Sequence, residues 1–187
     1  MSLILAKNIS EFKNFSNIDS KLMIYERNVP QGSVSFFKNL IKIDFSVNAE
    51  ISKFDTKNNI KSALSDVLSF EIKSSIFYEI WINDITHVCE IFCDIQNTSS
   101  ISMWIGSKRG CKRFHIDNVP QRLLVTYSGE GTEWLPDAAA DKSAYLNGES
   151  NEKILKFPQK KQFVTEWDIA IFKGGSQGLF TELQILP

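Results

Sequence analysis

The spacing of apolar residues changes once along this chain, close to Asn97. Before that point apolar side chains recur three and four positions apart, as in amphipathic helices. These segments are residues 33–45, 58–68 and 75–96. After it come short apolar runs broken by glycine, proline and charged residues, which are typical of strands and turns. These runs are residues 101–105, 114–119, 123–127, 162–172 and 178–186. Helices followed by strands predict an α+β protein in which a helical layer covers a sheet.

The length of 187 residues predicts one domain, residues 1–187. Within it, residues 1–97 should be mainly helical and residues 98–187 mainly β. A single strand is also expected over residues 21–27. Hydrophobic residues make up 43% and charged residues 23% of the chain, so a globular core can form without a disulfide or a structural metal.

Charge and composition exclude several functional classes. The net charge of -1 provides no basic face for nucleic acid. No run approaches the roughly 20 apolar residues of a membrane span, and the apolar start of the chain is too short for a signal peptide. Three cysteines without scaffold spacing indicate reduced thiols. We therefore expect a cytoplasmic protein that binds neither nucleic acid nor membranes. Its partner would be a small molecule or another protein.

His115 is one of only two histidines, and Asp117 follows it two positions later. In an extended segment both side chains would point to one face, while Phe114 and Ile116 would pack on the other. Their Cα atoms would lie about 6.6 Å apart, so that an imidazole nitrogen and a carboxylate oxygen could bind one ion. The pair fits half of the site of two histidines and one carboxylate that holds non-haem Fe(II). A hydrogen-bonded His/Asp pair without a metal is the alternative.

Cys111 has the same parity as His115 and Asp117, which makes a zinc site of these three residues a further possibility. About 13 Å of extended chain separates Cys111 from His115, so shared ligation requires a bend. A buried apolar thiol is the alternative. Cys89 and Cys93 lie at i and i+4 of a predicted helix, where buried core thiols are the better interpretation.

Two further residues near the pair are candidates for ligand binding. Arg122 could form bidentate hydrogen bonds to an anionic ligand, or it could pair with Asp117 or Glu133. Tyr127 and Trp134 could line a pocket, although core packing is the more usual role of aromatic residues in such strands.

Residues 111–136, with the sequence CKRFHIDNVPQRLLVTYSGEGTEWLP, resemble the signature of an uncharacterised bacterial family called domain of unknown function 1826. A looser resemblance includes residues 24–27, the helix that ends near residue 96, and residues 167–174. It therefore covers most of the chain. The family resemblance implies no particular activity.

The order of His115, Asp117, Arg122 and Tyr127 is also distantly similar to that in prolyl-hydroxylase-like Fe(II)/2-oxoglutarate oxygenases. This resemblance implies N-terminal helices packed on a cupin-like double-stranded β-helix, or jelly roll. It also implies Fe(II) bound by His115 and Asp117, with Arg122 and Tyr127 beside a cofactor such as 2-oxoglutarate.

The chain departs from that pattern near its C-terminus. Thr181 stands at or near the position where the resemblance implies a distal histidine, and no Lys or Arg follows Lys173 to bind the 2-oxoglutarate carboxylate. These differences imply a metal-binding protein with impaired catalysis, or a sequence that lacks its natural C-terminal end. The alternatives are a non-enzymatic module that binds a small molecule or a protein, and a zinc-handling protein.

Overall fold

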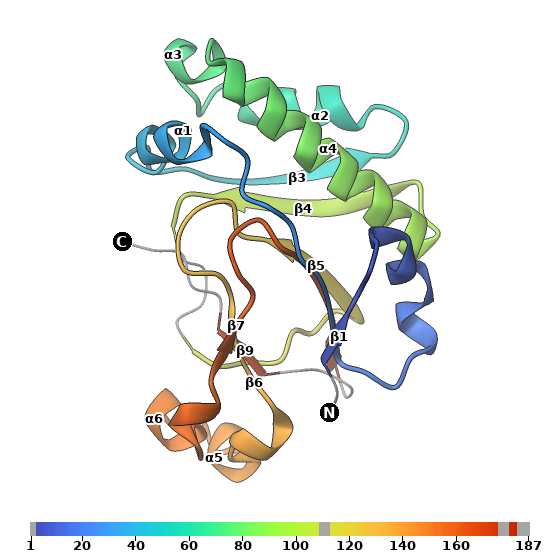
Figure 1. Cartoon of the computed structure of the whole chain (residues 1–187), viewed down its shortest axis with the longest axis vertical. Helices are drawn as coiled ribbons and strands as arrows, with labels where there is room; N and C mark the ends of the chain where they lie inside the picture. The colour runs from blue at the N-terminus through green and yellow to red at the C-terminus, as the bar shows by residue number, and fades with distance from the viewer. Residues whose placement is uncertain (1–2, 109–112, 176–179, 183–187) are drawn as a thin grey trace. The chain divides into compact units, whose positions relative to one another are not determined.

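The computed structural model describes residues 3–108, 113–175 and 180–182, which fall into two compact units (Figure 1). Residues 30–108 form one unit, here called the helical unit. Residues 1–29 together with residues 109–187 form the other, here called the β unit. The boundaries of these units differ from the division at residues 97 and 98 that the sequence pattern indicates. The prediction that the whole chain is one domain is untested.

The helical unit combines four α-helices with a two-stranded antiparallel sheet. Its elements are α1 (Ser33–Leu40), β3 (Ser46–Ser52), α2 (Thr56–Leu64), α3 (Phe70–Lys73), α4 (Ile76–Gln96) and β4 (Ser100–Gly106). The helices expected over residues 33–45, 58–68 and 75–96 are therefore confirmed, with different ends. Strand β3 was not predicted, and it pairs with β4 along its whole length, from Ser46 opposite Gly106 to Ser52 opposite Ser100.

Helix starts in this unit follow local capping chemistry. The Ser75 side-chain oxygen accepts a hydrogen bond from the Phe77 N–H and so caps α4. Helix α1 instead begins after Gly32, whose φ of 88° is accessible to glycine without steric cost. No side-chain hydrogen bond caps α1, so the glycine conformation sets the start of this helix.

Trp81 of α4 lies at the centre of the helical unit and is 2% exposed. Its ring centroid lies 5.8 Å from those of both Phe36 and Phe37 on α1. Further along α4, Cys89 is buried, and its Sγ atom lies 4.0 Å from Met103 Sδ on β4. The interpretation of the α4 cysteines as core residues is therefore confirmed.

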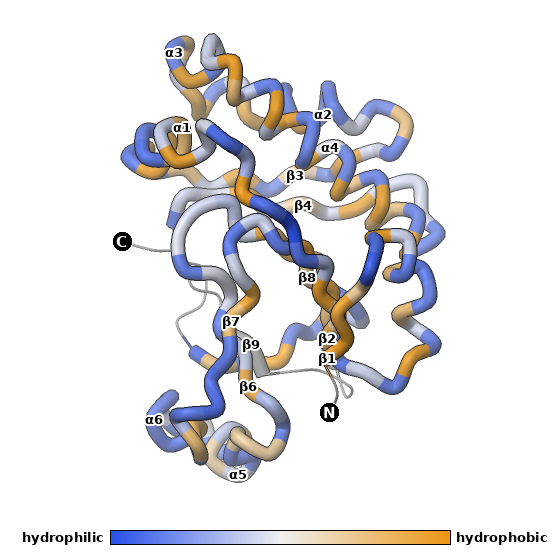
Figure 2. Tube along the Cα trace, viewed as in Figure 1, coloured by the Kyte–Doolittle hydropathy of each residue, from blue (hydrophilic) through white to orange (hydrophobic). Residues whose placement is uncertain are grey.

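The β unit contains two sheets with short helices between their strands. Its elements are β1 (Leu3–Leu5), η1 (Ile9–Asn17), β2 (Leu22–Tyr25), β5 (Gln121–Val125), β6 (Glu133–Leu135), η2 (Asp137–Ala139), α5 (Lys142–Leu146), α6 (Asn151–Ile154), η3 (Pro158–Lys160), β7 (Gln162–Phe163), β8 (Ile169–Lys173) and β9 (Phe180–Glu182). One sheet has the order β1-β2-β8-β5 and the other β7-β6-β9. Apolar residues are concentrated in β2 and β8, the central strands of the first sheet (Figure 2).

The two sheets of the β unit meet through one cluster of buried side chains. Its buried members are Leu22, Ile24, Trp134, Val164, Ala170 and Phe172, and Leu124 packs against them. In the strand register Arg122 lies opposite Phe172, two positions from Leu124, so Arg122 shares this inner face. Trp134, which is 3% exposed, is thereby confirmed as a core residue.

The α+β class is confirmed, but a double-stranded β-helix is not. Strand β1 runs parallel to β2, and within the described residues the sheets of the β unit contain four and three strands. Strands also precede the helices, because β1 and β2 belong to the same sheet as β5 and β8. Among the described residues, no helix is both long enough and apolar enough to cross a membrane.

Candidate functional site

The segment that carries His115 and Asp117 is held by backbone contacts with the end of β8. The Gly175 N–H donates a hydrogen bond of 2.7 Å to the Asp117 carbonyl oxygen. A Cβ atom at Gly174 would lie 2.5 Å from that same oxygen, so only glycine allows this close approach. The strand expected over residues 114–119 is therefore wrong, apart from one bridge position at His115.

Side chains in this segment nevertheless alternate between two faces. Phe114 is 1% exposed, and both Phe114 and Ile116 pack in a cluster with Leu135 of β6. His115 and Asp117 point the other way and converge. The predicted separation into a packing face and a polar face is confirmed, although the backbone forms no regular strand.

His115 is oriented by a contact with the backbone of the preceding turn. Its Nδ1 atom lies 2.8 Å from the carbonyl oxygen of Arg113, and a carbonyl can only accept a hydrogen bond, so Nδ1 must carry a proton. The other ring nitrogen, Nε2, lies 3.7 Å from Asp117 Oδ1. The His115 side chain is 27% exposed and that of Asp117 only 7%. The site is therefore largely enclosed but reachable from solvent on the histidine side.

Arg122 binds the second carboxylate oxygen of Asp117. Its Nε atom donates a hydrogen bond of 2.8 Å to Asp117 Oδ2, and its side chain is 38% exposed. Glu133, the other suggested partner of Arg122, lies instead with its Oε1 atom 3.1 Å from Lys161 Nζ. Pairing of Arg122 with Asp117 is therefore confirmed, and its use for a cofactor carboxylate stays a prediction.

The surroundings of Asp117 keep its carboxyl group ionised. Burial alone would raise the pKa of Asp117, but the neighbouring His115 imidazole and the charge and hydrogen bond of Arg122 outweigh it. The net result is a pKa below the ordinary value of 3.8. Asp117 is consequently a carboxylate at neutral pH, which is the form that a metal ion requires.

Tyr127 belongs to a separate aromatic contact. Its ring lies edge-on to Trp167, with centroids 4.9 Å apart. The Trp167 backbone has a φ of 70°, and its carbonyl oxygen accepts a hydrogen bond of 2.6 Å from Arg27 Nε. The prediction that Tyr127 borders a cofactor is untested.

Within residues 3–108, 113–175 and 180–182, no group of three His, Cys, Asp or Glu side chains could hold a metal ion. Thr181, where the resemblance implies a histidine, lies in β9 opposite Trp134 of β6. Cys111 lies outside the described residues, so the suggested zinc site remains a prediction.

Sequence reasoning did not identify the glycine pair at 174 and 175 as part of the site. The signal was present, because two consecutive glycines directly after an apolar strand are typical of a close backbone approach. The role of the Arg113 carbonyl oxygen had no comparable signal, since any residue supplies the same backbone group.

The chain matches the model of a family described as protein of unknown function (DUF1826) over residues 6–178. The match covers most of the chain, and the protein belongs to this family. No curated protein and no solved structure matches the chain. The family resemblance seen in the sequence is thus confirmed, whereas the distant resemblance to the oxygenases is not.

Proposed function

We propose that this protein binds one divalent transition-metal ion through His115 Nε2 and Asp117 Oδ1, and that it does not turn over 2-oxoglutarate. Fe(II) is the ion that the distant resemblance implies, and zinc is the alternative. The observation that carries the proposal is the convergence of these two atoms at 3.7 Å, each oriented by a contact on its far side.

The contacts around the pair are those that support metal ligands in proteins. A metal-binding histidine usually donates its other ring N–H to a carbonyl or carboxylate, and the bound carboxylate is itself hydrogen-bonded. His115 makes the first contact with Arg113, and Asp117 makes the second with Arg122. The residues present therefore fit two of the ligands of such a site.

The charge distribution favours a cation between the two atoms. With the Nδ1 proton directed to a carbonyl oxygen, a neutral imidazole presents the lone pair of Nε2 to an ionised carboxylate. Two acceptors that face each other are stabilised by a positive charge between them. Either a proton on Nε2 or a metal ion supplies that charge, and binding measurements distinguish the two.

The absence of turnover follows from what surrounds the pair in the sequence. A bound Fe(II) would supply open coordination positions for small ligands. However, Arg122 is already engaged by Asp117 and is therefore not free to hold the carboxylate of 2-oxoglutarate. Thr181 is a poor replacement for an imidazole ligand.

Titration of chelator-treated protein with Co(II), a spectroscopic substitute for Fe(II), tests the binding. We expect one ion per chain, and an affinity at least about tenfold lower in His115→Ala and in Asp117→Asn. His87→Ala is the matched control, because His87 is the second histidine and lies exposed on α4. Absence of binding, or equal losses in the His87 variant, would overturn the proposal.

The same preparations distinguish the metals and test catalysis. Iron and zinc content after expression, measured by elemental analysis, should fall together with Co(II) affinity in the His115 variant. With Fe(II) and 2-oxoglutarate added, succinate should not exceed the level in a protein-free blank. Succinate formation that depends on His115 would contradict the non-catalytic part of the proposal while supporting the metal site.

A further inference from the structure

The two-stranded sheet of β3 and β4 in the helical unit has one covered face and one open face (Figure 1). Odd-numbered residues face the helices: Met103 contacts Cys89 of α4, and Ile51 is fully buried. Even-numbered residues point the other way, because side chains alternate along a strand. Those on this open face are Ser46, Asn48, Glu50, Ser52, Ser100, Ser102, Trp104 and Gly106. The open face thus carries one aromatic ring and one carboxylate but no basic side chain.

Trp104 is exposed on the open face, yet its ring is held in one orientation. The indole Nε1–H donates a hydrogen bond of 2.9 Å to Ser46 Oγ on β3. The ring also lies close over Gly106, where a Cβ atom would be 2.7 Å from Trp104 Cζ2. Trp104 is nevertheless 41% exposed, whereas Trp81, Trp134 and Trp167 are each 2 to 3% exposed. A ligand that stacks on this ring therefore loses little side-chain entropy of the protein.

The charges on the open face favour a cationic ligand. Trp167 has the guanidinium of Arg27 over its ring at 5.7 Å, but within the described residues no cation lies over Trp104. Glu50 lies on the same face and is exposed. Its Oε1 atom accepts a hydrogen bond of 2.8 Å from Ser100, and no ion pair of Glu50 forms in the described part of the chain. An indole ring and an unpaired carboxylate both attract a positive charge.

The outer edge of β3 also offers backbone groups to an extended chain. The Ser107 N–H donates to the Phe45 carbonyl oxygen, so the residues just beyond the strand ends form a hydrogen-bonded pair. Such pairs alternate with non-hydrogen-bonded pairs in an antiparallel ladder, so the N–H and C=O groups of Asn48 and Glu50 point away from β4. These groups have no hydrogen-bonding partner among the described residues. An open edge of this kind can pair with a peptide strand.

We propose that the edge of β3 and the open face bind an extended peptide segment of a partner protein, with arginine at alternate positions. The segment pairs with β3 and places its arginines beside Asn48 and Glu50, which are about 6.8 Å apart along the strand. One guanidinium reaches over Asn48 to stack on Trp104, and the other pairs with Glu50. Guanidinium suits both positions because it is planar, stacks on aromatic rings and forms two hydrogen bonds to a carboxylate. This proposal is independent of the metal site.

Titration of the ¹⁵N-labelled protein with acetyl-Thr-Arg-Thr-Arg-Thr-amide, followed by NMR, tests the binding of arginine. Of the four indole N–H signals, we expect only that of Trp104 to shift, because the other three rings are buried. A peptide with citrulline in place of arginine keeps the shape but loses the charge, and it should bind at least about threefold more weakly. Equal affinity for the two peptides, or an unchanged Trp104 signal at millimolar peptide, would overturn the proposal.

Substitutions on the open face test which residues recognise the charge. Trp104→Leu and Glu50→Gln should each reduce the preference for arginine over citrulline by about two- to fivefold, measured from backbone amide signals of β3. Phe54→Leu and Glu71→Gln are the matched controls, because both residues are exposed in the same unit and lie outside the open face. A preference that survives in both test variants, or falls equally in the controls, would contradict the assignment.

A proline at position 48 tests the pairing of strands. Asn48→Pro removes an N–H that points away from β4 and leaves the ladder intact, whereas Asn48→Ala removes only the side chain. The proline variant should bind the arginine peptide about fivefold more weakly than the alanine variant. Acetyl-arginine amide has no strand to add, so its weaker binding should be the same in both variants. Equal affinity of the two variants for the peptide would overturn the strand pairing.

Discussion

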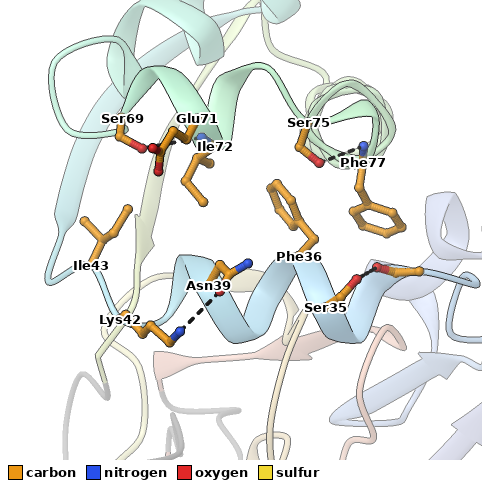
Figure 3. Close-up of a pocket in the computed structure, with 11 residues that line it drawn as sticks. Ser35, Phe36, Asn39, Lys42, Ile43, Ser69, Glu71, Ile72, Ser75 and Phe77 are labelled. Atoms are coloured by element: carbon orange, nitrogen blue, oxygen red, sulfur yellow. Dashed lines mark hydrogen bonds between the residues drawn. The ribbon is translucent and has the colours of Figure 1, made fainter.

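The charged side chains compared here differ between the two units in burial and in ion pairing. In the β unit, Asp117 is 7% exposed and contacts both Arg122 and His115. In the helical unit, Lys42 and Glu71 line a groove of about 560 Å³ beside α1 and α3 (Figure 3), and within the described residues they form no ion pair. A buried charge must be paired to offset its lost hydration, whereas a rim charge remains hydrated and available. The buried arrangement holds the carboxylate of Asp117 in one orientation, whereas the exposed side chains of Lys42 and Glu71 remain hydrated.

The two regions also differ in how their geometry is fixed. The groove is built on regular helices whose positions depend on packing around Trp81. The candidate metal pair lies on an irregular segment whose position depends on backbone contacts with Gly174 and Gly175. Substitutions that remove packing should therefore matter most in the helical unit, and substitutions that add a single carbon should matter most in the β unit.

Trp81→Ala should produce the largest effect. The ring is 2% exposed, and its loss should lower the free energy of unfolding by about 3 to 5 kcal/mol. Urea unfolding followed by circular dichroism measures this value. Phe54→Ala, at an exposed aromatic position of the same unit, should change stability by less than about 0.5 kcal/mol. Similar values for the two variants would show that Trp81 does not organise the helical unit.

Gly174→Ala should have a smaller effect on stability but a specific effect on the site. The added Cβ would overlap the Asp117 carbonyl oxygen, which should cost about 1 to 3 kcal/mol and displace the carboxylate. Co(II) affinity should fall together with stability. Gly148→Ala is the control, because its Cβ meets no atom within 4 Å and only its φ of 74° is strained. That variant should lose stability while keeping its affinity for Co(II).

The same contrast explains how far the sequence predicts the fold. Helix α4 is predicted well because its apolar spacing over residues 75–96 agrees with its buried face. Strand β3 is missed although Val47, Ala49 and Ile51 alternate with the exposed Ser46, Asn48 and Glu50, which is the pattern of a half-buried strand. Pairing with β4 supplies its stability, and the local alternation does not identify that partner.

For the candidate site, the sequence predicts the residues better than the backbone. The two-residue spacing of His115 and Asp117 correctly places both side chains on one face, opposite Phe114. It also predicts a regular strand, which does not form, because contacts with Gly174 and Gly175 determine the path of the chain. Such contacts join segments that are far apart in sequence and cannot be inferred from local spacing.

Asp117→Asn, in metal-free protein, should reveal the buried ion pair through its pH dependence. The pKa of Asp117 is lowered on folding, so its contribution is fully present above the unfolded pKa and is lost as pH falls through the folded pKa. The variant should be about 1 to 2 kcal/mol less stable at pH 7, because the partly exposed Arg122 is screened by solvent. This difference should shrink as the pH falls below 3.8.

Urea unfolding at a series of pH values measures the difference between the two proteins. Asp66→Asn, at an exposed position of the helical unit, should stay within about 0.5 kcal/mol of the wild type at pH 7. A constant gap between wild type and Asp117→Asn from neutral to acidic pH would contradict a charge-based role. It would place the effect in the packing of Asp117 instead.

Ser75→Ala should give the smallest effect. It tests whether the helix cap contributes to the stability of the helical unit in addition to packing. The serine oxygen satisfies the Phe77 N–H at the start of α4, so its removal should cost about 1 kcal/mol. Ser74→Ala is the control, because Ser74 is exposed and its side chain caps no helix. Thermal unfolding should separate the two variants by a few degrees. Equal stability of the Ser75→Ala and Ser74→Ala variants would mean that packing around Trp81 alone determines where α4 begins. The helical unit would then depend on packing, whereas the segment of His115 and Asp117 depends on the backbone contacts of Gly174 and Gly175.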